Sequence, residues 1–178
     1  MQLSMPTIIK DNAIIESPYT VISIMETTDN PDAIDHVNCL LPMTFYQQHV
    51  AALAGRRDLG IWLSSGDDVE ALGKLVQHLP VIALHFPTFG DGRAYSSAAI
   101  LRTRLHYQGE IRAIGDVRRD ELEQMQRCGI NAFELAEGQD AQACLQALTT
   151  FSFSYQASVD RPTPLFRHRV SPRERKHG

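Results

Sequence analysis

Cysteine, aromatic side chains and long apolar runs are all scarce in this chain of 178 residues. Its three cysteines, Cys39, Cys128 and Cys144, lie far apart and form no CxxC pair. A structural zinc site or an iron–sulfur cluster normally takes about four protein ligands, so these thiols predict neither. Because free cysteine usually packs as a small hydrophobic side chain, we interpret the three thiols as reduced and partly buried. A single reactive thiol is the alternative.

Sequence motifs for metals, nucleotides and membranes are missing as well. The seven histidines show neither HxH nor HExxH spacing, and the chain has no GxGxxG after a strand-like run, no GxxxxGK[ST] and no GxSxG. The sequence therefore predicts no metal and no cofactor, and it disfavours a nucleotide-dependent enzyme. No apolar run approaches the roughly 20 residues of a membrane-spanning helix, and the first residues lack the regions of a signal peptide. We expect a cytoplasmic protein without a membrane partner.

Positive charge is concentrated at one end of the chain, although the formal net charge is −4. Residues 161–178 contain six basic side chains against Glu174 alone, a net charge of +5, so residues 1–160 carry −9. We expect residues 1–160 to form a single α/β domain and residues 161–178 to be a basic, partly disordered tail. The tail could also contact nucleic acid, an acidic partner or its own domain. Arginines of the domain interleave with acids, which predicts a solvated surface and no nucleic-acid partner; they are Arg102, Arg104, Arg112, Arg118, Arg119 and Arg127.

Segments of strand length alternate with segments of helical period through the middle of the chain. Residues 59–63 and 81–86 are apolar runs, residues 110–115 and 131–135 are further strand segments, and the alternating sequence FSFSYQ at residues 151–156 is a plausible fifth strand. This rhythm predicts right-handed βαβ crossovers and a mostly parallel sheet of about five strands. Two interpretations stay open, namely an open layered sheet and a partial, barrel-like arc.

Turn and capping residues predict where the other elements begin and end. Asp11 and Asn12 separate two β-prone runs, which predicts an N-terminal hairpin. Pro42 can open a short helix that ends near Gly55. Further helix starts are expected at Ser64 or Ser65 with Asp67 and Asp68, at Ser96 and Ser97, at Asp120 and at Asp140, and helix ends at Pro80, Gly109 and Gly129.

Ligands of parallel α/β proteins bind beyond the carboxyl ends of the strands. That rule selects residues 64–67, 89–97, 116–119 and Tyr155 with Gln156. The second segment is the richest, because glycine permits close backbone approach, Arg93 suits a carboxylate or phosphate, and a helix start adds amide donors. The alternative is a structural turn in which Asp91 and Arg93 form a pair. The predicted ligand-binding residues are Gly92, Arg93, Tyr95, Ser96, Ser97 and Arg119.

Three residues of the same strand ends are candidates for catalysis. Asp116 follows a strand directly and could be a general base or could orient Arg93, while the alternative is a turn cap. His85 could titrate near neutral pH at the end of its strand, or it could be a structural histidine. Asp91 is the third candidate.

Three stretches give the chain a specific family resemblance. They read DGRAYSSAAILRTR at residues 91–104, GEIRAIGDV at 109–117 and QRCGINAF at 126–133. In them the chain resembles a bacterial family of unknown function that is often described as a probable oxidoreductase involved in sulfite reduction. The resemblance runs from about residue 8 to 169. Departures from the family pattern occur at Ala94, Asp120, Glu121, Ile130 and Asn131.

The resemblance implies a role in assimilatory sulfur metabolism, because genes of this family commonly lie near those for sulfite reductase and phosphoadenosine-phosphosulfate reductase. Sulfite reduction transfers six electrons, for which this chain offers neither clustered cysteines nor a nucleotide motif. We therefore expect an accessory or partner-binding protein without its own redox centre, with sulfite reductase, another sulfur-assimilation enzyme or a small oxyanion as partner. The alternative is an α/β enzyme that acts on a small anionic metabolite.

Overall fold

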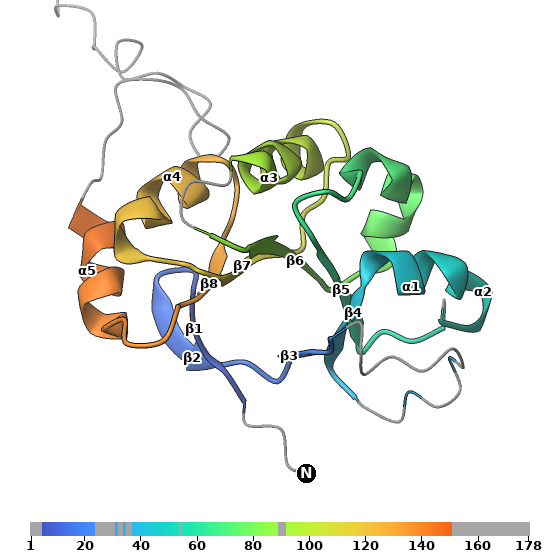
Figure 1. Ribbon diagram of the computed structural model, residues 1–178, viewed down its shortest axis with the longest axis horizontal. Helices are drawn as coiled ribbons and strands as arrows, with labels where there is room; N and C mark the ends of the chain where they lie inside the picture. Colours follow the sequence, from blue (N-terminus) through green and yellow to red (C-terminus); the bar gives the residue numbers. More distant parts are fainter. Residues whose placement is uncertain are drawn as a thin grey trace, which may run out of the picture.

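The computed structural model describes residues 5–23, 31, 34, 37–53, 55–88 and 92–150. Within them, eight strands form one curled sheet, a half-barrel with its helices around the outside (Figure 1). The strand order is β2-β1-β8-β7-β6-β5-β4-β3. The strands are β1 (Thr7–Lys10), β2 (Ala13–Glu16), β3 (Thr20–Val21), β4 (Cys39–Pro42), β5 (Leu59–Leu63), β6 (Val81–Phe86), β7 (Glu110–Gly115) and β8 (Ala132–Glu134).

The sheet is mixed, with a parallel part and an antiparallel edge. Strands β3 to β8 run parallel to their neighbours, whereas β1 pairs antiparallel with both β8 and β2. The expectation of a parallel α/β sheet with an N-terminal hairpin is confirmed. The expectation of about five strands is wrong, because β3 and β4 are short and carry weak sequence signals. Residues 151–156, the predicted fifth strand, lie outside the described residues.

The N-terminal hairpin turns at the predicted place. Asp11 and Asn12 have φ angles of 48° and 61°, and Lys10 is paired with Ala13 across the turn. A two-residue turn with both φ angles positive matches the twist of the two strands that it joins. The hairpin places β1 next to β8, a strand near the other end of the described part of the sequence.

The helix after Pro42 is interrupted. Pro42 precedes α1 (Met43–Gln48) as predicted, but His49 separates α1 from α2 (Val50–Leu53). The next helix, η2 (Val69–His78), is a 3-10 helix that is kinked at Gly73, where φ is 49°. Its cap is Asp68, whose side chain accepts a hydrogen bond from the Glu70 amide, so the predicted start at Ser64 or Ser65 is wrong.

Helix α3 (Arg93–Thr103) ends differently from the prediction. The left-handed residue after it is His106, with φ of 51°, and Gly109 is not left-handed. Gly109 instead leaves space for a ring, because a Cβ atom there would collide with the Tyr107 side chain. The predicted conformational role of Gly109 is therefore replaced by a packing role.

The last helices follow their signals more closely. A 3-10 turn, η3 (Arg119–Glu121), leads into α4 (Leu122–Arg127), so Asp120 lies inside the turn and does not cap it. Gly129 ends this helix in a left-handed conformation with φ of 103°, as predicted. Asp140 caps α5 (Ala141–Thr150), because its Oδ1 accepts hydrogen bonds from the amides of the second and third helix residues.

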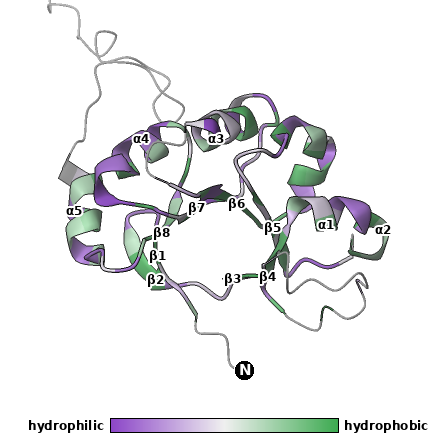
Figure 2. Cartoon of the chain, in the orientation of Figure 1, coloured by the Kyte–Doolittle hydropathy of each residue, from purple (hydrophilic) through white to green (hydrophobic). Residues whose placement is uncertain are grey.

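Apolar side chains fill both faces of the curled sheet. The outer layer, between strands and helices, includes Ile61, Leu84 and Leu101. The inner layer on the concave face includes Leu40 and Ile114. Figure 2 shows hydrophobic residues along β4 and β5. None of the helices in the described ranges is both long and apolar enough to cross a membrane.

Candidate functional site

The candidate site lies at the carboxyl ends of β5, β6 and β7. These strands are adjacent and parallel, so the segments that follow them begin at one edge of the sheet. Residues 64–67 follow β5, Gly92 precedes α3, which begins at Arg93 after β6, and residues 116–119 follow β7. Residues 89–91, with the catalytic candidate Asp91, and the fourth segment with Tyr155 and Gln156 lie outside the described residues.

Arg93 is the first residue of α3 and is exposed. The helix has Gly92 as its N-cap, no side-chain hydrogen bond to the cap and no acidic residue in its first turn. Among the residues that the structure describes, no side chain caps the amides of that turn, and no carboxylate within the turn offsets the positive end of the helix dipole. Together with the Arg93 guanidinium, this helix start favours an anion.

Ser96 and Ser97 do not cap this helix, which corrects the prediction. The helix begins three residues before Ser96, so both serines lie within it. The Ser97 hydroxyl donates to the Arg93 carbonyl, with 3.4 Å between the oxygens. Within residues 92–97, only Gly92 and Arg93 lie at the start of the helix.

Tyr95 faces a neighbouring helix. Its hydroxyl donates to Glu121 Oε1 over 3.2 Å, and its ring meets the Phe86 ring edge-on at 5.3 Å between centroids. Burial raises the pKa of Tyr95, with a further contribution from the Glu121 carboxylate. Tyr95 thus links α3 to η3. This contact gives the predicted ligand-binding residue a structural role.

Asp116 lies directly after β7 and carries an ion pair. Arg118 Nε donates to Asp116 Oδ1 over 2.8 Å, and this hydrogen bond raises the pKa of Arg118. Arg119 is exposed, and its backbone amide donates to Gln139 Oε1 over 3.2 Å. Asp116 therefore stabilises the loop as a structural carboxylate does. Its side chain is about a quarter exposed.

His85 lies beside this loop on the inward-facing side of β6. Its ring meets Trp62 edge-on, with centroids 6.0 Å apart. A Cβ atom on Gly115, whose φ is 96°, would lie 2.9 Å from His85 Cδ2. Because Gly115 immediately precedes Asp116, the two described candidates for catalysis flank one glycine.

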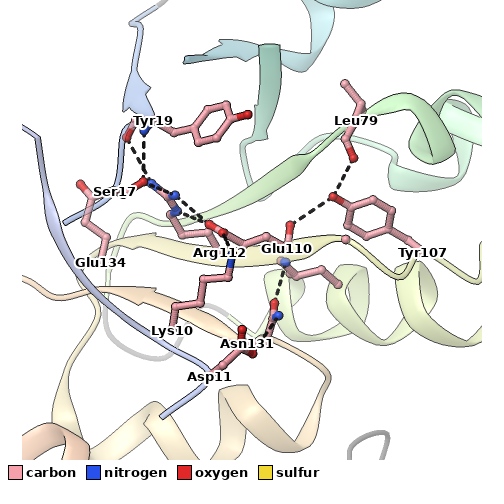
Figure 3. A network of polar contacts seen from close by, with 12 residues as sticks. Lys10, Asp11, Ser17, Tyr19, Leu79, Tyr107, Glu110, Arg112, Asn131 and Glu134 are labelled. Carbon is pink, nitrogen blue, oxygen red and sulfur yellow. Dashed lines mark hydrogen bonds and ion pairs between the residues drawn. The ribbon is translucent and has the colours of Figure 1, made fainter. Parts of the chain in front are cut away.

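The sequence analysis missed a buried ionic network on the concave face (Figure 3). Arg112, expected on a solvated surface, has an exposed fraction of 0%. Its Nε donates to Glu110 Oε1 over 2.8 Å and its Nη2 to Ser17 Oγ over 2.6 Å. Its Nη1 lies 3.3 Å from the Tyr19 carbonyl oxygen. Arg112 therefore spans from β7 to the residues that connect β2 with β3.

Two further ionisable groups complete this network. Lys10 Nζ lies 2.8 Å from Glu110 Oε2, and Arg112 Nη1 lies 3.8 Å from Glu134 Oε2. Burial raises the pKa of Glu134, against the opposing effect of Arg112. The alternation of Glu110 and Arg112 with apolar residues in β7 is the sequence signal that could have placed both on one face.

The cysteines lie where small hydrophobic side chains are expected. Cys39 and Cys144 are buried and Cys128 is half-buried, all three as free thiols. Burial raises the pKa of Cys39 to about 11 and also raises that of Cys144. Within the described ranges, no group of three or more histidine, cysteine, aspartate or glutamate residues is arranged to hold a metal ion.

Comparison with curated proteins found no match. The model of a bacterial protein family of unknown function (DUF934) matches residues 60–166. The match covers more than half of the chain and includes β6, β7, β8 and the candidate site. The chain therefore belongs to this bacterial family of unknown function.

Proposed function

We propose that the protein serves sulfite and sulfate reduction as an accessory protein that binds a small oxyanion at the start of α3. Sulfite reductase or another sulfur-assimilation enzyme is the proposed partner. In this proposal the protein presents or senses the anion and has no redox centre of its own. The pathway rests on the sequence resemblance, whereas the anion rests on the geometry of the candidate site.

The observation that carries the anion is the charge at the start of α3. Arg93 is exposed at the first position of an 11-residue helix that has no acidic residue in its first turn. An oxyanion there would accept hydrogen bonds from first-turn amides and from the planar fork of the arginine. The helix follows β6, so the anion would lie at the edge where parallel α/β proteins bind ligands.

The test measures thermal unfolding of the full chain with sulfate, sulfite and phosphoadenosine phosphosulfate, and with chloride at matched ionic strength. An anion that binds the native state raises the melting temperature. We expect stabilisation by at least one of these oxyanions beyond that of chloride. Equal effects of all the salts would contradict the proposal.

Arg93→Lys tests the geometry of recognition. Lysine keeps the charge but lacks the bidentate fork, so the oxyanion should bind more weakly. Arg104→Lys is the matched control, because Arg104 is exposed just beyond the other end of the same helix and pairs with Glu70. Equal binding by the Arg93→Lys variant would show that planar recognition at this turn is wrong.

An enzyme acting on a small anionic metabolite is the second candidate, favoured by the position of His85 and Asp116 on either side of Gly115. A histidine and a carboxylate at one strand edge are suited to general acid–base chemistry. If an anion that stabilises the protein is also turned over, His85→Asn should abolish turnover while preserving that stabilisation. Unchanged turnover in this variant would remove His85 from the reaction.

A further inference from the structure

A cavity of about 380 Å³ lies beside the start of β8, away from the carboxyl ends of the parallel strands. The hairpin turn at Asp11 and Asn12 forms one wall, and Arg102 of α3 forms another. Asn131 lies between them, next to the first residue of β8. Because the cavity gathers residues from three distant parts of the sequence, its shape depends on the complete fold.

Arg102 supplies a fixed positive charge to this cavity. Its Nε donates to the Gly129 carbonyl over 2.9 Å, and its Nη1 donates to the carbonyls of Tyr107 and Gly109 over 2.7 and 2.8 Å. Its Nη2 donates to Asn131 Oδ1 over 3.2 Å. These bonds hold the guanidinium rigidly, yet none of the four acceptors is a carboxylate.

The Arg102 guanidinium has more N–H donors than these four bonds use. Arginine has five N–H groups, and the four bonds described leave one N–H on Nη2 without an acceptor among the residues that the structure describes. A ligand carboxylate in the cavity would supply both an acceptor for this N–H and a negative charge beside the guanidinium.

Asp11 supplies the opposite charge. It is exposed in a left-handed turn conformation, and Asn131 Nδ2 donates to its Oδ1 over 3.4 Å. Burial lowers the pKa of Arg102, and the Asp11 carboxylate opposes part of this shift. Asn12 and Gln126, which carry amide groups, also line the cavity, and so do Ile130 and Phe133, whose side chains are almost fully buried.

We propose that this cavity binds a free α-amino acid. The ligand carboxylate would accept from Arg102 Nη2, and the ammonium group would donate to Asp11. An inorganic oxyanion would be repelled by Asp11, and a metal cation would be repelled by Arg102. A zwitterion satisfies both charges at once, so it fits this pair better than an ion of either sign.

The probes are L-leucine, L-methionine and L-phenylalanine, each compared with its amide and its N-acetyl derivative. The amide lacks the carboxylate and the N-acetyl derivative lacks the ammonium group. We expect at least one free amino acid to raise the melting temperature of the full chain, and both of its blocked derivatives to lose the effect. The inference is overturned if none of the three binds, or if either derivative binds as well as the parent amino acid.

Asp11→Asn tests the ammonium contact. Asparagine also adopts the left-handed conformation, so the hairpin turn is preserved. The substitution should weaken amino-acid binding by about tenfold or more, the loss expected for a charge-assisted hydrogen bond. The matched control is Glu16→Gln, an exposed carboxylate on the same hairpin that does not line the cavity. Unchanged affinity in Asp11→Asn, measured by calorimetry, would contradict the contact.

This inference is independent of the proposed oxyanion site. Arg93 does not line the cavity, so Arg93→Lys should leave amino-acid binding unchanged. Loss of oxyanion binding with retained amino-acid binding, or the reverse, therefore identifies which of the two proposals fails.

Discussion

Arg112 occupies an environment that arginine rarely tolerates without partners. It is fully buried, and its hydrogen bonds reach Glu110, Ser17 and Tyr19. Removing one member of such a group leaves the other buried charge without compensation. The contribution of Arg112 to stability should therefore far exceed that of an exposed arginine.

We predict that Arg112→Met lowers the free energy of unfolding by about 3–5 kcal/mol, as expected when one partner of a buried ion pair is removed. Urea unfolding measures the change. Arg104→Met is the control, because Arg104 pairs with Glu70 on the surface and such pairs contribute about 0–1 kcal/mol. Similar losses in the two variants would show that the Arg112 network does not stabilise the fold.

Gly109 gives a second prediction for a single residue. A Cβ atom there would collide with the Tyr107 ring, so Gly109→Ala should destabilise the protein by about 1–3 kcal/mol, the usual cost of overpacking. Gly66→Ala is the matched control, because a Cβ atom at Gly66 would have no neighbour within 4 Å. Thermal unfolding distinguishes the two, and an equally stable Gly109→Ala variant would contradict the packing role.

Single residues were the least predictable part of the candidate site. Arg112 was expected in solvent because arginine is usually exposed, and only its register in β7 places it on the concave face. Tyr95 was assigned to a ligand, but its partner Glu121 comes from a separate turn. Such pairings depend on how elements pack, which local sequence does not encode.

At the scale of elements, continuous apolar runs were reliable signals. The predicted strands at residues 59–63, 81–86 and 110–115 have the observed bounds of β5, β6 and β7. The runs of β5 and β6 are apolar on both faces, so run and strand coincide, whereas β7 carries Glu110 and Arg112 on one face. By contrast, β3 has two residues and β4 ends at Pro42, which indicated a helix start.

The start of α5 was predictable, because an aspartate forms its cap. Asp140 accepts hydrogen bonds from the amides of Gln142 and Ala143. We predict that Asp140→Ala destabilises the protein by about 1 kcal/mol, the typical loss of an N-cap. Chemical unfolding measures the loss, with Glu137→Ala as the control at an exposed residue of the preceding loop. Equal stability of the two variants would show that the cap does not contribute.

At the scale of the whole molecule, Glu134 and Asp58 should give opposite responses to pH. Burial raises the pKa of Glu134 in the folded protein, so the native state holds this proton more tightly than the unfolded state. Stability from Glu134 is therefore greatest below its unfolded pKa and falls as pH rises through the folded pKa. Hydrogen bonding to Arg56 lowers the pKa of Asp58, so its contribution is present above the unfolded pKa and is lost as pH falls.

We predict that Glu134→Gln stabilises the protein relative to the parent at neutral pH and that this advantage disappears in acid. Asp58→Asn should destabilise the protein at neutral pH, and its deficit should shrink in acid. Urea unfolding at several pH values measures both differences. A stability difference for Glu134→Gln that does not change with pH would contradict the buried carboxylate.

The pairing of β1 with β8 also sets an order of events during synthesis. Asp11 and Asn131, which meet beside these strands, are 120 residues apart in the sequence, and Arg112 reaches back 95 residues to Ser17. Contacts of such long range form late and slow folding. As the chain leaves the ribosome, β1 therefore remains unpaired with β8 until β8 has been made. Its Ile8 and Ile9, which are buried in the folded protein, are accessible to chaperones until the sheet is complete.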